Sequence, residues 1–162
     1  DPVRALETGL GLWGLRFLLA SLAITPLMWL GVRLMKFRRA LGLLGFIYIA
    51  LHFLTWIGLD MAFRWTEVLT DLTKRPYIVI GAIGLLLLVP LAATSWNGAI
   101  RRLGPLWKKL HRLAYPAILA GALHFVMIGK VWTMESLIYL GLALGLLGLR
   151  LGRFRQKVPS PA

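Results

Sequence analysis

The sequence predicts an all-α integral membrane protein, a bundle of five transmembrane helices that forms one domain over residues 1–162. Two observations predict this fold class. Hydrophobic residues make up 59% of the chain and the mean hydropathy is +0.75, whereas a soluble domain is closer to half apolar. Long uncharged runs also recur along the chain and leave too little polar surface for a soluble core.

Five runs have, or nearly have, the roughly 17–25 residues that a membrane-spanning helix needs. In chain order these runs are residues 17–32, 40–59, 76–100, 113–129 and 136–149. The first continues an apolar stretch that only Arg16 interrupts, and the end of the third is expected to be a loop. The last reaches spanning length only with residues 131–134.

The charges alternate between the two sides of these runs. Every second connecting segment, the C-terminal tail included, is basic and contains no acid. Together these segments hold thirteen basic residues: Arg33, Lys36, Arg38, Arg39, Arg101, Arg102, Lys108, Lys109, Arg112, Arg150, Arg153, Arg155 and Lys157. The other side carries Arg4, Arg16, Arg64, Lys74, Arg75, Lys130 and all six acids, so its net charge is zero. The positive-inside rule predicts a cytoplasmic C-terminus and residue 1 on the outer side. The net charge of +13 then reflects topology and anionic lipid rather than nucleic acid.

An outer start with no signal peptide suggests an upstream helix before Asp1. We therefore expect a parent protein with six spans and both ends in the cytoplasm.

The three histidines are the candidate metal ligands of this chain. The chain has no cysteine, which excludes thiolate metal sites and iron–sulfur clusters. His52 lies thirteen residues beyond Arg39, and His124 twelve beyond Arg112. At 1.5 Å per residue, both lie about 18–20 Å from the basic side, on helices that run in the same direction. Two imidazoles at one depth could hold a haem iron from both faces.

His111 lies near the basic side, where a second haem would sit, but the second span has no histidine at that level. On a straight helix His111 and His124 point about 140° apart, and Pro116 between them could change the local winding. Cations could bind haem propionates, and Arg16 and Arg39 are the strongest candidates. Residues 94–109 combine two tryptophans with four cations, which predicts either a loop with interface anchors or a docking surface for an electron donor, a quinone or a flavin.

Several stretches resemble a known family, the haem-binding membrane subunits of the periplasmic methionine-sulfoxide reductase system (MsrQ or YedZ), within the ferric-reductase-like superfamily. The resemblance covers nearly the whole chain. The stretches are DPV, LRFLLASLAITPL, IALHFLTW, TKRPYIVIG and TSWNGAIRRLGPLWKKLHRLAYPAILAGALHF.

The resemblance implies a multi-pass protein of the bacterial inner membrane, with b haem held by His52 and His124. For a second haem, the resemblance implies His111 as a ligand. NADPH oxidases of the superfamily carry two histidines on each of two spans, whereas the second span of this chain carries only His52. Electrons would come from quinol or a cytoplasmic flavin reductase, with FMN as a further cofactor. They would pass to a periplasmic molybdopterin-containing methionine-sulfoxide reductase.

The sequence thus predicts an electron-transfer subunit rather than a complete enzyme. Three alternatives stay open. The chain could be a stand-alone ferric reductase or oxidase, a transporter that relays protons through its histidines, or a structural anchor for a partner.

Overall fold

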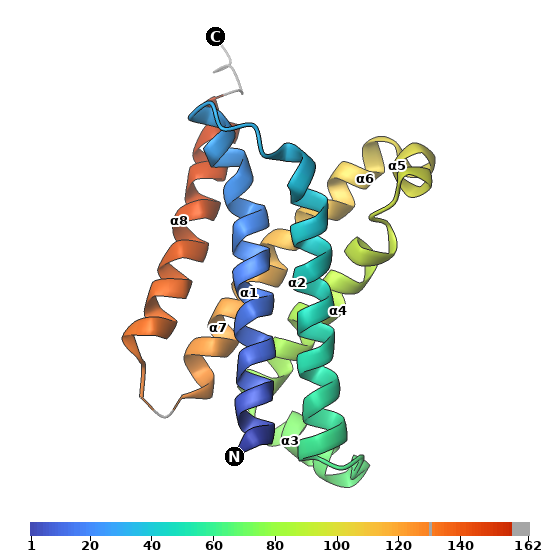
Figure 1. The fold of residues 1–162 in the computed structure, drawn as a ribbon, viewed down its shortest axis with the longest axis vertical. Helices are drawn as coiled ribbons and strands as arrows, with labels where there is room; N and C mark the ends of the chain where they lie inside the picture. The colour runs from blue at the N-terminus through green and yellow to red at the C-terminus, as the bar shows by residue number, and fades with distance from the viewer. Residues whose placement is uncertain (130, 157–162) are drawn as a thin grey trace.

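The computed structural model describes residues 1–129 and 131–156, with backbone alone for residues 151–156, and this part of the chain is helical (Figure 1). In chain order the elements are α1 (Pro2–Trp29), α2 (Met35–Thr55), the π-helical turn η1 (Trp56–Asp60), α3 (Trp65–Lys74), α4 (Pro76–Ala93), α5 (Asn97–Leu103), α6 (Pro105–Leu110), the 3-10 turn η2 (His111–Leu113), α7 (Ala114–Ile128) and α8 (Met134–Gln156).

Four helical segments of the described chain are long and apolar enough to cross a membrane. They are Pro2–Trp29, Met35–Asp60, Pro76–Ala93 and Pro105–Ile128. The fifth predicted span corresponds to α8, and its membrane crossing stays a prediction because α8 is not among these four segments. The first helix begins well before residue 17, since Asp1 caps it by accepting hydrogen bonds from the amides of Val3 and Arg4.

The segment 94–109 differs from the expected loop, because it folds into the short helices α5 and α6. Gly104 separates them at φ 49°, a left-handed conformation that glycine adopts without steric strain. Pro105 then starts α6, where its missing amide hydrogen is not needed.

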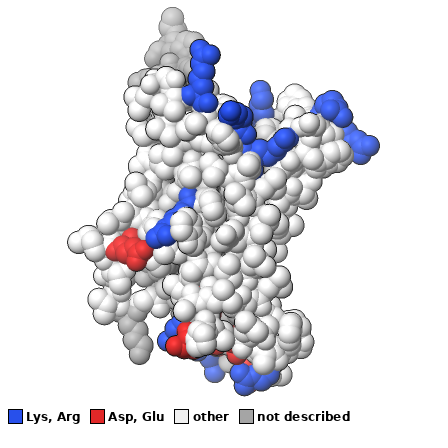
Figure 2. Space-filling view, viewed as in Figure 1, with Lys and Arg blue, Asp and Glu red and all other residues white. Residues whose placement is uncertain are grey.

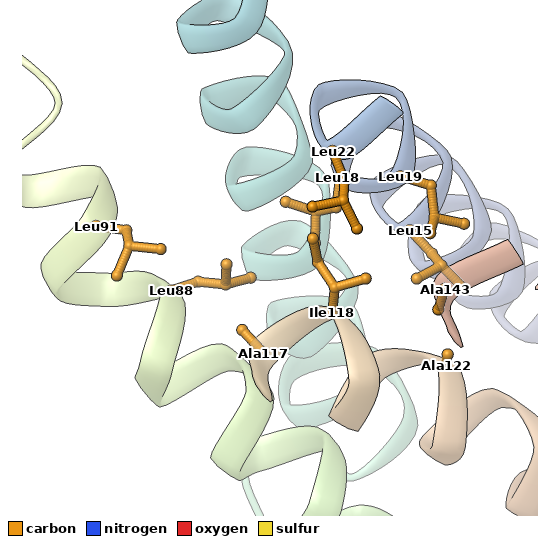
Figure 3. Close-up of a cluster of buried hydrophobic side chains, with 10 residues drawn as sticks. All are labelled: Leu15, Leu18, Leu19, Leu22, Leu88, Leu91, Ala117, Ile118, Ala122 and Ala143. Carbon is orange, nitrogen blue, oxygen red and sulfur yellow. The ribbon is translucent and has the colours of Figure 1, made fainter. Parts of the chain in front are cut away.

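The long helices form two antiparallel pairs, α1 with α2 and α4 with α7, and α8 lies along α1 and α7 (Figure 1). Leucines of α1 and α4 meet small residues of α7 and α8 in the centre of the bundle (Figure 3). This core consists of Leu15, Leu18, Leu19, Leu22, Leu88, Leu91, Ala117, Ile118, Ala122 and Ala143. Because α2 and α7 both descend in Figure 1, they run in the same direction, as the charge pattern predicted.

The two ends of the bundle differ in charge. One end holds the end of α1, the start of α2, and α5 and α6; in Figure 2 this end shows Lys and Arg but no Asp or Glu. We call it the basic end. Acidic side chains appear toward the opposite end, where the chain starts and α3 lies. Lys130 and the side chains of Arg153, Arg155 and Lys157 lie outside the described residues.

Glycines allow α1 and α2 to pack closely. A Cβ atom at Gly45 would lie 2.6 Å from Leu18 Cδ2 and 3.2 Å from the Leu18 backbone nitrogen. We expect Gly45→Ala to destabilise the fold by about 1–3 kcal/mol, because overpacking forces the helices apart. Gly42→Ala is the matched control on the same helix, since its nearest neighbour is 3.7 Å away. Thermal unfolding in detergent measures both variants, and equal midpoints would contradict the prediction.

Candidate functional site

The rings of His52 and His124 lie next to each other between α2 and α7. Their centroids are 6.1 Å apart and their planes are inclined by 74°. The counted depths from the basic side therefore predicted correctly that these two side chains lie at one level. Both residues are half-buried, and they come from helices that belong to different antiparallel pairs.

A backbone carbonyl of α1 fixes the orientation of His52. The His52 Nδ1 atom is 2.9 Å from the carbonyl oxygen of Glu7. A carbonyl can only accept, so Nδ1 carries the hydrogen and Nε2 keeps its lone pair. Gly11 lies one turn beyond Glu7, and a Cβ atom there would be 3.1 Å from Nδ1. The missing side chain at residue 11 therefore lets the imidazole reach the carbonyl.

The same arrangement occurs at His124 in the second helix pair. Its Nδ1 atom is 2.7 Å from the carbonyl oxygen of Tyr77 on α4. Gly81, again four residues further on, leaves the space that the ring occupies, because a Cβ atom there would be 2.8 Å from Nδ1. Sequence reasoning missed both glycines. The available signal was a glycine in the preceding span at about the depth of each histidine.

This geometry suits two ligands of one metal. Metal–imidazole nitrogen bonds are about 2 Å long, so two rings that would share one ion have centres at most about 6 Å apart. The observed 6.1 Å agrees with this spacing. Each Nδ1–H donates to a backbone carbonyl, which is the usual way in which a protein orients a ligating histidine and selects Nε2 for the metal. The residues present therefore fit an iron centre held by His52 and His124.

His111 is not part of this pair. It lies in η2 at the basic end, where its ring stacks on Trp107 with centroids 3.9 Å apart. Its Nε2 atom is 3.1 Å from Oγ1 of Thr94, and that hydroxyl donates to the Pro90 carbonyl. Nε2–H is then the donor to Thr94, the reverse of the tautomer at the pair. The winding changes in the 3-10 turn η2, before Pro116, and this change does not bring His111 to the side of His124, because the two rings have different neighbours.

The two predicted cations have protein partners. Arg16 donates from Nε to the Tyr139 hydroxyl at 2.6 Å and lies 3.8 Å from Glu135, so it links α1 to α8. Arg39 donates to Asn97 Oδ1 at 2.7 Å on the surface of the basic end. Neither contact involves a histidine of the pair, and a role of these arginines in cofactor binding stays a prediction.

The helical bundle and the paired histidines are the features by which the chain can be compared with known membrane proteins. Residues 10–122 match the family model described as "Ferric reductase like transmembrane component". Together with the four apolar helices, this match identifies a multi-pass membrane protein.

Relatives narrow the class further. A protein of Brucella anthropi is 49% identical over 99% of this chain and 74% of its own length. A protein of Brucella ovis is 47% identical over the whole chain and 74% of its own length. Both are named "Protein-methionine-sulfoxide reductase heme-binding subunit MsrQ". The chain belongs to the MsrQ family. No solved structure matches it.

Proposed function

We propose that this chain is a haem-binding membrane subunit of a methionine-sulfoxide reductase system, with one b haem between His52 and His124. The observation that carries the proposal is the 6.1 Å spacing of the two rings with both Nδ1 atoms on backbone carbonyls. The names of the relatives, which are haem-binding subunits, support it. Haem iron would supply a one-electron redox centre.

The protein's own groups would prepare the site for electron transfer. Carbonyls from two helix pairs hold the imidazoles, so the orientation of these side chains is fixed before a cofactor enters. The apolar bundle around the rings excludes water and lowers the local dielectric. If the subunit binds a second haem, His111 would be its ligand at the basic end.

The charge asymmetry supports a direction for the electrons. With the basic end in the bacterial cytoplasm, as the positive-inside rule predicts, the donor side carries α5 and α6 and the paired histidines lie in the outer half of the inner membrane. Quinol or a cytoplasmic flavin reductase would reduce the subunit at the basic end, with FMN or quinone as a further cofactor of the subunit. A periplasmic molybdopterin-containing methionine-sulfoxide reductase would take the electrons at the opposite end.

A difference spectrum tests the haem assignment. Purified protein from cells supplied with haem should give a b-type reduced-minus-oxidised spectrum, whereas colourless protein would contradict the proposal and favour the proton-relay transporter. The electron route is tested by mixing the reduced subunit with its periplasmic reductase and methionine sulfoxide. We expect reoxidation only when both are present; reoxidation by ferric ion alone would favour a stand-alone ferric reductase.

A further inference from the structure

Arg150 on α8 is the one arginine or lysine that is buried among the described side chains, with 6% of its surface exposed. Its guanidinium reaches across to two other helices. One terminal nitrogen donates to the Leu22 carbonyl at 2.8 Å and to Thr25 Oγ1 at 2.7 Å, both on α1. The other donates to the Tyr115 hydroxyl on α7 at 3.0 Å. All these acceptors are neutral, so they satisfy hydrogen bonds but leave the positive charge uncompensated.

One nitrogen of the Arg150 guanidinium has no hydrogen-bond partner in the described structure. This nitrogen is Nε, and it is buried. A buried polar group without a partner is rare in folded proteins and calls for an explanation, such as a ligand that is bound in the working protein. The unused Nε is therefore a first sign that a further acceptor belongs at this position.

No carboxylate side chain of the sequence lies near enough to supply that acceptor. The chain has six acids, and the two nearest in the helices that surround Arg150 are Glu7 and Glu135. Glu135 lies fifteen residues before Arg150 on α8, about 22 Å along the helix, and Glu7 is equally far from Leu22 on α1. The other acids are at the start of the chain or in residues 60–71 at the opposite end.

A second cation makes the imbalance larger. Arg38 on α2 is half-buried, and its backbone carbonyl accepts a hydrogen bond from Ser21 at 3.1 Å, next to Leu22, whose carbonyl binds Arg150. Two neighbouring positive charges in a low-dielectric bundle repel each other, and a buried charge without a counter-charge is strongly destabilising. An external anion would remove both penalties.

We propose that Arg150 and Arg38 form an internal binding site for one oxyanion, a carboxylate or phosphate group of a molecule that enters from the basic end. Guanidinium groups are the side chains best suited to these two anions. The site lies between α1, α2, α7 and α8, and it does not require haem at the histidine pair. The anion could belong to a membrane lipid or to a soluble cofactor, and these sources share the same recognition chemistry.

Three pairs of probes distinguish the sources, because one member of each pair lacks the negative group. Binding of FMN is compared with riboflavin, haem with haem dimethyl ester, and phosphatidylglycerol with phosphatidylcholine, the lipids being counted by native mass spectrometry of nanodiscs. We expect the wild-type protein to prefer the anionic member of at least one pair by about tenfold or more. Equal binding within all three pairs would overturn the proposal.

Variants identify the residue responsible. Arg150→Gln should abolish the preference, and Arg150→Lys should retain part of it because the charge remains. Arg101→Gln is the matched control, since it removes an exposed cation from the same end of the bundle. A preference that is lost equally in Arg101→Gln would show general surface attraction and would overturn the site. If Arg150→Gln does not fold, Arg150→Lys decides in its place, because a preference as strong as in the wild-type protein would overturn the site.

Discussion

Alanine at either His52 or His124 is expected to abolish the haem difference spectrum of the paired site. A haem iron held by two imidazoles depends on both, and mutations of groups that only orient a ligand already reduce metal affinity about 10–100-fold. Loss of the ligand itself should have a larger effect. The measurement is haem per protein, from the reduced-minus-oxidised spectrum of purified variants that elute at the wild-type volume in size exclusion.

His111→Ala is the matched control for these two variants. It removes the third histidine, about 20 Å along the chain from His124, and should lower the haem content without abolishing the spectrum. Free imidazole provides a second test, because it should restore part of the spectrum in His52→Ala if the side chain acts as a ligand. A spectrum that survives both substitutions at the pair but disappears in His111→Ala would reverse the assignment.

The height of the pair was predictable because it depends on quantities that are the same in every helix. The rise per residue is constant, and the segregated charges give each span its direction. Counting from Arg39 and Arg112 therefore placed His52 and His124 at one level, and the ring spacing agrees. The grouping of acids away from one end was also visible in the sequence and appears in Figure 2.

The partners of the histidines could not be predicted in the same way. Glu7 and Tyr77 contribute backbone carbonyls, which every residue carries, so nothing in their side chains identifies them. The angle of about 140° between His111 and His124 was predictable for a straight helix, but the neighbours of His111 were not. The turn η2 precedes α7, and it turns His111 toward Thr94 and Trp107 rather than toward α2.

Charge counting also treated all arginines as equivalent. Arg150 was assigned to the basic tail, but the structure buries it against α1 and α7. Arg16 was considered as a cation for propionates, whereas its hydrogen bond reaches Tyr139, which is 123 residues away in the chain. Such pairings depend on which helices are neighbours, and the sequence of a single chain does not show this.

The second large effect is expected from Gly81→Ala, although the substitution adds only one methyl group. In a helix, replacing glycine by alanine normally stabilises by about 0.5–1 kcal/mol. At residue 81 the new Cβ atom would lie 2.8 Å from His124 Nδ1 and block the hydrogen bond from the ring to the Tyr77 carbonyl. The imidazole would have to rotate away, so haem affinity should fall about 10–100-fold, as it does when other orienting groups of metal ligands are removed.

Gly11→Ala should act in the same direction at His52, but less strongly, because the corresponding distance is 3.1 Å. Gly9→Ala lies on the same helix with no atom within 4 Å of its Cβ position. This control should keep the full spectrum and raise the unfolding temperature slightly. Haem titration and thermal unfolding of the three variants separate a local effect on the ligand from a loss of fold. If all three behaved alike, the glycines would be packing residues, and the carbonyl–imidazole contacts would not determine haem binding.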